Sequence, residues 1–236
     1  MKSITFASFK GGAGKTTAVM AVASVLSQMG KRVALIDADE NFPLLEWREN
    51  AMKADTWSDG ITVHEADDLR SFEKAFEEAS QAGISYALID TRGGGSELNN
   101  ACLINTDLVI IPSALTTLDM TQALTTFEHV IELHQSMAMD ITTALLIQRV
   151  PVRKLTVSQR HDLNALSELP CCETRLHNRD AFAALGKRGL LHRIHAQLKN
   201  DPVKRISAGH IAAAMDEARA LTNDLLEALD ESVEKN

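Results

Sequence analysis

Cysteine, aromatic residues and long apolar runs are all scarce in this chain of 236 residues. Its three cysteines are Cys102 and the adjacent Cys171 and Cys172, and the absence of any CxxC spacing argues against a zinc site or an iron–sulfur cluster. No apolar run approaches the roughly 18 residues of a membrane helix, and nothing near the amino terminus has the pattern of a signal peptide. We therefore expect a soluble, cytoplasmic protein without membrane insertion.

The residues that are abundant suffice for one large hydrophobic core. Hydrophobic residues make up 45% of the chain, and no repeat, low-complexity tract or linker interrupts it, so we expect a single domain over residues 1–236. The formal net charge is −8, but residues 149–205 hold twelve Lys or Arg against five Asp or Glu, so this segment carries +7 and the rest −15. Such an asymmetry can mark an interaction surface, although charge runs also occur on ordinary solvated surface.

Strand-like and helix-like patterns alternate along the first part of the chain. Short apolar runs typical of strands buried on both faces occur at residues 4–9, 33–36, 61–63, 86–89, 108–111 and 144–147. Helical patterns occur at residues 67–81 and 119–137 and, after the last strand pattern, at 156–168, 179–185 and 207–231. This order predicts a doubly wound α/β fold, in which helices cover both faces of a mostly parallel sheet.

A glycine-rich segment connects the first predicted strand to the first predicted helix. It reads Phe9-Lys10-Gly11-Gly12-Ala13-Gly14-Lys15-Thr16-Thr17. In this context successive backbone N–H groups and a helix N-terminus wrap phosphate oxygens, and glycine allows the backbone to come close. The lysine before the two threonines adds a point charge, and the first threonine is placed to give its hydroxyl to Mg²⁺. We therefore predict a site for a nucleoside triphosphate and Mg²⁺ at residues 11–17.

The segment departs from the usual phosphate-loop pattern in an informative way. The pattern GxxxxGK[ST] requires glycine at position 9, where this chain has Phe9, whereas the deviant version KGGxGKTT fits at every position. At this point the chain resembles the ParA/MinD group of deviant-Walker ATPases over essentially its whole length. The resemblance implies a weak, Mg²⁺-dependent ATPase that acts as a two-state switch. It also implies that Lys10 reaches across an ATP-bound homodimer to the partner's phosphates.

Three acidic residues follow predicted strands at the edge of the sheet where such folds place their ligands. Asp90 comes directly after residues 86–89 and is the natural Walker B carboxylate for Mg²⁺. Asp37 ends the second strand and is placed to support the metal shell. The resemblance assigns Asp39 to orienting the attacking water, which makes it catalytic together with Lys10 and Lys15. The alternative for Asp37 and Asp39 is that they are simple loop acids.

Two further segments bear on the nucleotide. The run Asp90-Thr91-Arg92-Gly93-Gly94-Gly95 could sense the γ-phosphate through a glycine N–H, as switch segments do, although related ATPases usually carry prolines there. No NKxD guanine signature occurs, and Gln148 and Arg149 stand where the resemblance places an adenine-contacting Asn. ATP as the nucleotide therefore depends mostly on the resemblance.

Other motifs narrow the resemblance to the VirC-type ParA relatives of tumour- and root-inducing plasmids. These motifs are Trp47-Arg48-Glu49-Asn50, Gln148-Arg149-Val150-Pro151 and Arg179-Asp180-Ala181-Phe182. The relationship implies binding of double-stranded DNA near the border enhancer of transferred DNA (T-DNA), and recruitment of a relaxase complex to a cell pole. Basic residues that could neutralise DNA phosphates are Arg153, Lys154, Lys187, Arg188, Arg193, Lys199, Lys204 and Arg205. The alternative is that these charges pair with the chain's own acidic helices.

Two other functions remain open on the sequence. One is a plasmid or chromosome partition ATPase, which would act on the nucleoid with a centromere-binding adaptor. The other belongs to a different class, a metabolic ATP-dependent ligase of the same fold, similar to dethiobiotin synthetase. The first would respond to DNA and an adaptor protein, and the second would consume ATP only with a small metabolite.

Overall fold

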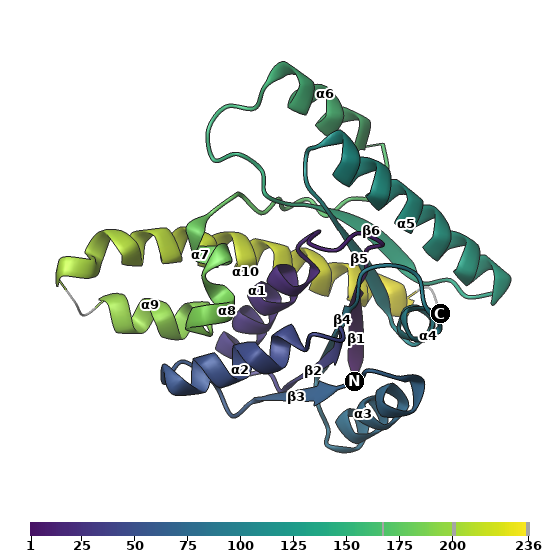
Figure 1. Ribbon diagram of the computed structural model, residues 1–236, viewed down its shortest axis with the longest axis horizontal. Coiled ribbons are helices and arrows are strands. Elements are labelled where there is room, and N and C mark those ends of the chain that lie inside the picture. The colour runs from purple at the N-terminus through teal and green to yellow at the C-terminus, as the bar shows by residue number, and fades with distance from the viewer. Residues whose placement is uncertain (167, 200–201, 235–236) are drawn as a thin grey trace.

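A six-stranded sheet forms the centre of the computed structural model, which describes residues 1–166, 168–199 and 202–234 (Figure 1). Every strand pair is parallel, and the strand order is β3-β2-β4-β1-β5-β6. The strands are β1 (Lys2–Phe6), β2 (Val33–Ala38), β3 (Ile61–Glu65), β4 (Tyr86–Thr91), β5 (Leu108–Ser113) and β6 (Thr142–Ile147). The predicted α/β fold with a parallel sheet is therefore confirmed.

Helices connect the strands and extend the chain beyond β6. Those within the strand region are α1 (Lys15–Gln28), α2 (Pro43–Lys53), α3 (Leu69–Gln81), α4 (Glu97–Ile104) and α5 (Thr117–Ser136). Those that follow β6 are α6 (Val157–Leu166), α7 (Asp180–Ala183), α8 (Leu185–Arg188), α9 (Leu191–Lys199), the 3₁₀ turn η1 (Pro202–Lys204) and α10 (Arg205–Glu234). Within the described residues, no helix is both long and apolar enough to cross a membrane.

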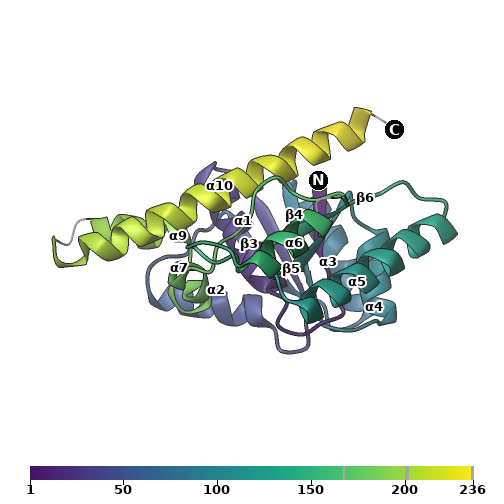
Figure 2. The same cartoon turned by 90° about the horizontal axis from the view of Figure 1, so that it is seen from above.

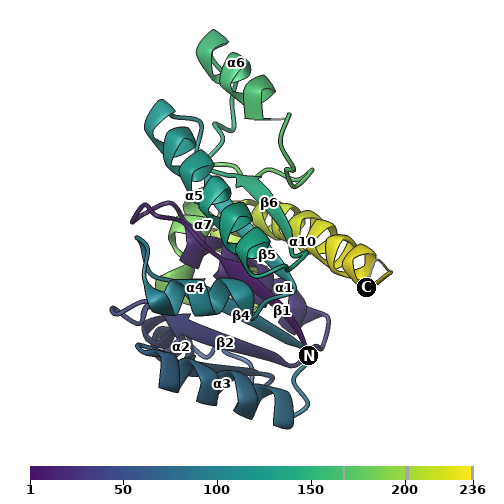
Figure 3. The same ribbon diagram turned by 90° about the vertical axis from the view of Figure 1, so that its right-hand side faces the viewer.

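The helices form a layer on each face of the sheet. On one face α1 packs between the sheet and α10, which runs along the long axis of the molecule (Figures 1 and 2). On the other face α3, α4 and α5 lie together, and α6 packs beside α5 (Figure 3). Because both faces are covered, strands such as β2 and β5 are buried along their whole length.

Local signals explain several of the helix starts. Asp68 precedes α3, where its side chain accepts a hydrogen bond from Ser71 N at 2.7 Å while Asp68 N donates to the Ser71 hydroxyl at 3.0 Å, a reciprocal capping box. Thr116 caps α5 by accepting from Asp119 N at 3.2 Å. The predicted helix at 67–81 is thus found two residues shorter, and the one at 119–137 begins two residues earlier.

Other predicted boundaries are corrected. The first strand ends at Phe6 and not at position 9, because the chain leaves the sheet to form the loop that precedes α1. The helix predicted at 179–185 is two short helices, α7 and α8. The helix predicted at 156–168 corresponds to α6, and residue 167 lies outside the described residues.

The register of the central strands determines where the site lies. Phe6 is paired with Asp90, and Asp37 is also paired with Asp90, so the carboxyl ends of β1, β4 and β2 are aligned. The loop after β1 and the acids that end β4 and β2 therefore meet at one edge of the sheet. Ligands of doubly wound folds bind at this edge.

Candidate nucleotide-binding site

The loop between β1 and α1 has the backbone of an anion-binding turn. Gly12 has φ of 76° and Gly14 has φ of 95°, both in the left-handed region where glycine is favoured. Gly14 is also the N-cap of α1, so the unpaired N–H groups of the first helical turn point out of the sheet edge. The structure therefore gives a physical reason for glycine at these two positions of the predicted phosphate loop.

Lys15 is the first residue of α1 and is almost completely buried, with 6% of its surface exposed. Burial lowers the pKa of Lys15, while the charges of Asp90 and Asp39 act in the opposite direction without cancelling the effect. A buried ammonium with incomplete compensation favours an anionic ligand. This is the electrostatic property expected of a phosphate-binding lysine.

Thr16 and Asp90 form the part of the site that suits a metal ion. The Thr16 hydroxyl donates a hydrogen bond of 2.6 Å to Asp90 Oδ2, and Asp90 Oδ1 has no hydrogen-bond partner among the described residues. Burial raises the pKa of Asp90 to about 7, although the Thr16 hydroxyl and the charge of Lys15 lower it. Hydroxyl and carboxylate oxygens are the ligands that Mg²⁺ prefers. The donor set therefore fits the predicted ion.

Asp37 and Asp39 lie in different environments. Asp37 is fully buried, and its Oδ2 accepts hydrogen bonds from Leu44 N at 2.7 Å and Leu45 N at 3.2 Å, in the first turn of α2. Burial raises its pKa to about 6 against these bonds. Asp39 is half-buried, and its Oδ1 accepts from the backbone and side-chain nitrogens of Asn41 at 3.0 and 2.9 Å. One oxygen of Asp37 thus stabilises α2, while Asp39 is close enough to Lys15 for its charge to act on the Lys15 pKa.

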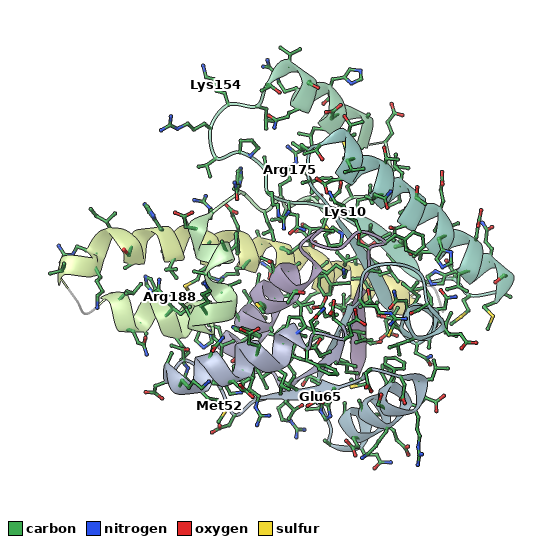
Figure 4. All side chains as sticks on the ribbon, in the orientation of Figure 1. Lys10, Met52, Glu65, Lys154, Arg175 and Arg188 are labelled. Atoms are coloured by element: carbon green, nitrogen blue, oxygen red, sulfur yellow. The ribbon has the colours of Figure 1, made fainter. Side chains whose placement is uncertain are left out.

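Lys10 contacts an acid that the sequence patterns do not reveal. Its ammonium lies 2.5 Å from Asp119 Oδ1, and the other Asp119 oxygen accepts from the Thr116 hydroxyl at 2.6 Å (Figure 4 labels Lys10). Burial raises the pKa of Asp119, but hydrogen bonds from Lys10 and Thr116 outweigh this and keep the pKa below its usual value. Lys10 is therefore held within its own chain. Asp119 is 109 residues away in sequence, so no local motif could have identified it.

The segment after Asp90 packs against the loop entrance. A Cβ at Gly93 would lie 3.0 Å from Gly11 N, and Gly94 N donates to Phe9 O at 3.0 Å. Gly94 has φ of 90°, and its carbonyl accepts from the Asn99 side chain at 2.5 Å. The glycines at 93 and 94 therefore permit a close backbone approach. This contact places the predicted switch segment directly beside the phosphate loop.

A cavity of about 100 Å³ opens beside the phosphate loop at Thr17. Gln148 is buried, and its Nε2 donates to Ala13 O, so it links the end of β6 to the loop. Arg149 is exposed, with φ of 54°. The remaining walls come from residues that follow β6 by more than two dozen positions: Leu176, His177, Asn178, Arg179, Phe182 and Ala183.

This cavity, hereafter the base pocket, brings both predicted base-contacting residues to the loop. The motif Arg179-Asp180-Ala181-Phe182 supplies two of its wall residues, so the sequence contained a signal for this wall without indicating its location. Leu176, His177 and Asn178 lie in a segment that pairs with the chain after β6, through Val150 N to Leu176 O at 3.1 Å and Asn178 N to Val150 O at 2.8 Å.

The basic residues predicted to contact DNA lie on separate parts of the molecule. Figure 4 shows Lys154 beside α6 and Arg188 beside α9. Arg188 is half-buried, and its carbonyl accepts from the Thr56 hydroxyl at 2.7 Å. The other six are exposed in the loop before α6, on α8, α9 and η1, and at the start of α10: Arg153, Lys187, Arg193, Lys199, Lys204 and Arg205.

The chain has the α/β fold of P-loop NTPases of the MinD/ParA type. Similar solved structures include apo McdA from Cyanothece, with a TM-score of 0.65 and 20% identity over 91% of this chain and 99% of that chain. A chain of the MinC:MinD cell division complex from Aquifex aeolicus has a TM-score of 0.64 and 20% identity, over 94% and 96%. Cobyrinic acid a,c-diamide synthase from Mycobacterium smegmatis, with bound ADP and magnesium, has a TM-score of 0.60 and 18% identity, over 89% of this chain and 96% of that chain.

Sequence comparison gives a narrower assignment. The family model described as VirC1 protein matches residues 1–231. Protein virC1 from Rhizobium rhizogenes is 46% identical over 230 residues, which cover 98% of this chain and 100% of that protein. Protein virC1 from Rhizobium radiobacter is 48% identical over 217 residues, covering 92% and 94%. The chain belongs to the VirC1 family, which confirms the resemblance to VirC-type relatives. Protein ParA from Rhizobium radiobacter is 24% identical over 240 residues, covering 99% and 100%.

Proposed function

We propose that this chain is a weak, Mg²⁺-dependent ATPase that works as a DNA-associated switch in T-DNA transfer. The observation that carries the proposal is the cluster at the carboxyl edge of the sheet. There a buried lysine, Lys15, lies beside a glycine-lined helix N-terminus, and Thr16 and Asp90 present oxygen ligands 2.6 Å apart. Such a cluster suits a triphosphate and its metal ion.

ATP is the proposed nucleotide. The base pocket lies beside Thr17, where the base of a nucleotide held by the loop would extend, and it is lined by Gln148 and Arg149. The fold relative that holds ADP and magnesium supports an adenine nucleotide in this fold. We assign the triphosphate to residues 11–17, and Mg²⁺ to Thr16 and Asp90 with Asp37 behind them. When bound, Mg²⁺ neutralises charge on the β- and γ-phosphates.

Hydrolysis and dimerisation are assigned to residues around the open side of the site. Asp39 is half-buried and its charge acts on Lys15, so it is the proposed group that orients the attacking water. Lys15 stabilises charge on the phosphates. Lys10 is the proposed cross-dimer residue: once it leaves Asp119, it can contact the phosphates of a second copy. ATP would therefore hold two copies together, and hydrolysis would release them.

Double-stranded DNA and a DNA-processing complex are the proposed partners. The basic residues of the segment 149–205 are mostly exposed, and this suits contacts with phosphates that carry little sequence information. Because these residues lie on separate parts of one chain, a dimer is the form in which they could act together on a duplex. We propose that the switch recruits a relaxase complex and transferred DNA, acting as a single cytoplasmic domain at the nucleoid or a cell pole.

ATP-dependent dimerisation and duplex binding test the proposal directly. The mass of the protein is measured by light scattering with Mg²⁺ and either ATP, ADP or no nucleotide, and binding to a border-enhancer duplex is measured over a salt series. We expect a dimer only with ATP, and DNA affinity that falls steeply with salt. A protein that stays monomeric with ATP and ignores DNA would contradict the proposal.

Two other functions have specific support and distinct outcomes. The 24% identical ParA relative supports a partition ATPase, which would require a centromere-binding adaptor for full activity. The fold shared with cobyrinic acid a,c-diamide synthase supports a metabolic ligase. Rapid ATP consumption that depends on a small carboxylic acid, with no response to DNA, would favour the ligase.

A further inference from the structure

Helix α10 carries an acidic side chain that is buried against the wall of the base pocket. The side chain of Glu217 is only 14% exposed. Its Oε2 accepts a hydrogen bond from His177 N at 2.9 Å, and its Oε1 lies 2.9 Å from His177 Nδ1. Arg179 approaches the same Oε1 with Nε at 2.7 Å and Nη2 at 2.6 Å. One carboxylate therefore holds two residues of the pocket wall.

Glu217 does not itself form the wall. Among the described residues, the cavity is lined by His177 and Arg179 but not by Glu217. Any effect of Glu217 on a ligand in the pocket must therefore act through these two residues. Their separation from Glu217 by 40 and 38 positions means that the contact exists only in the folded chain.

Residues 176–179 of the wall precede α7 and are not part of a helix or strand. Their backbone is fixed by Val150 N to Leu176 O at 3.1 Å and Asn178 N to Val150 O at 2.8 Å. These bonds do not orient the side chains of His177 and Arg179. Hydrogen bonds to a carboxylate are roughly twice as strong as neutral ones, so Glu217 is the group that fixes both side chains.

An arginine whose orientation is fixed can stack on a nucleotide base. The guanidinium group is planar and stacks on aromatic rings when its orientation is held. Without Glu217, Arg179 would be a mobile cation that has to be ordered when the base enters, which lowers affinity. Pairing with Glu217 also offsets the charge of Arg179.

We propose that Glu217 is a positioning residue for the base end of the nucleotide. It orders Arg179 and His177, so that the base pocket is formed before a nucleotide binds. This inference rests on the proposed function, because it assumes that the phosphate loop holds a nucleoside triphosphate. It adds a residue of α10 to a site that is otherwise built from the strand edge and the chain that follows β6.

A comparison of two ligands separates this role from a general structural one. Binding of MgATP and of inorganic tripolyphosphate, which has no base, is measured by calorimetry for the wild-type protein and for Glu217→Ala. We expect the Kd for ATP to rise about tenfold, and the Kd for tripolyphosphate to stay within about twofold, because the phosphate loop is unchanged. Glu217→Gln keeps the size of the side chain and one acceptor oxygen, so its Kd for ATP should lie between those of the wild-type protein and Glu217→Ala.

Asp216→Asn is the matched control. Asp216 precedes Glu217 on α10, is exposed and pairs with Arg219 at 3.0 Å, away from the base pocket. Both Kd values should be unchanged in this variant. If Glu217→Ala does not fold, as judged by circular dichroism, the ratio of the two Kd values for Glu217→Gln decides the question.

Three results would count against the inference. Unchanged ATP binding in Glu217→Ala would overturn it while leaving the proposed function intact. An equal loss for ATP and tripolyphosphate would also overturn it, because the role would then be structural. Failure of the wild-type protein to bind either ligand would overturn the proposed function and this inference together.

Discussion

The phosphate end and the base end of the site treat buried charge in opposite ways. At the phosphate end, burial lowers the pKa of Lys15 and raises the pKa of Asp90 to about 7, so both groups lack full compensation within the chain. At the base end, Glu217 is paired with His177 and Arg179. Uncompensated charge destabilises a fold and is retained where a ligand supplies the missing partner. The phosphate end therefore suits a charged ligand, whereas the ion pairs at the base end fix the positions of the side chains in the pocket wall.

Lys15→Ala gives the largest expected effect and sharpens this contrast. The variant removes the buried ammonium at the first residue of α1. ATP and tripolyphosphate should therefore both bind more than about 100-fold more weakly. Calorimetry with the two ligands measures this. Glu217→Ala differs from this variant, because it should weaken the binding of ATP but not that of tripolyphosphate. Loss of ATP binding with normal tripolyphosphate binding would remove the distinction between the two ends.

Asp39→Ala should separate binding from hydrolysis. Because the hydrogen bonds of Asp39 are to Asn41 and not to the phosphate loop, the variant should bind ATP and dimerise normally while phosphate release falls by about 100-fold. A coupled phosphate-release assay at saturating ATP measures the rate. Normal hydrolysis in this variant would show that the water is oriented by another residue.

Variants of Lys10 and Asp119 test whether their ion pair restrains Lys10 from contacting the phosphates of a second copy. Asp119→Asn releases Lys10 from a partly exposed ion pair, which is worth up to about 1 kcal/mol, so ATP-dependent dimerisation should tighten by about threefold. Lys10→Ala should instead give an ATP-bound monomer. Analytical ultracentrifugation measures both.

Glu78→Gln is the control for Asp119→Asn. It removes contacts of Glu78 with Lys74 on α3, at 3.7 Å, and with His64 on β3, at 3.8 Å, neither of which involves Lys10, so dimerisation should be unchanged. Weaker dimers in Asp119→Asn would mean that Asp119 supports Lys10 and does not restrain it. Persistent ATP-dependent dimers in Lys10→Ala would refute the cross-dimer assignment.

Asp90 gives the smallest expected effect, on stability. An acid whose pKa is about 7 in the folded state and about 3.9 in an unfolded chain binds more protons when folded, so stability falls as pH rises between these values. The Tm of the nucleotide-free protein should therefore drop by roughly 5–10 °C between pH 5 and pH 8. In Asp90→Asn the drop should be smaller, and added Mg²⁺ with ATP should no longer raise the Tm. Calorimetric scans across pH measure it.

The sequence predicts the phosphate end well because phosphate chemistry needs particular residues at short spacing. Gly12, Gly14, Lys15 and Thr16 lie within five positions, and Asp90 follows an apolar run that could only be a buried strand. Helix α2 was not predicted, because its N-cap, Phe42, is in the left-handed region and its capping acceptor, Asp37, lies seven positions upstream of Leu44. Pro43 at the first helical position is a local start signal, but no Ser, Thr, Asp or Asn stands at the N-cap.

The base end could not be read from the sequence for a different reason. Its wall comes from residues 176–183, which have neither the length nor the alternation of a strand. The wall is fixed by backbone bonds to Val150 and by a carboxylate 38 to 40 positions away. Gln148 and Arg149 were identified from the resemblance, but their neighbours across the pocket follow only from the fold.

Residues 170–172 pair with β6 and cover this edge of the sheet. Leu145 N donates to Pro170 O at 2.8 Å and Cys172 N donates to Leu145 O at 2.9 Å, so backbone groups on the outer side of β6 are already satisfied by the same chain. An open strand edge invites pairing with another molecule and aggregation. At the opposite margin the sheet ends in β3, a strand of five residues in which Thr62 and Glu65 are exposed. Polymerisation through the sheet would thus be blocked at one margin by covering and discouraged at the other by brevity and polarity.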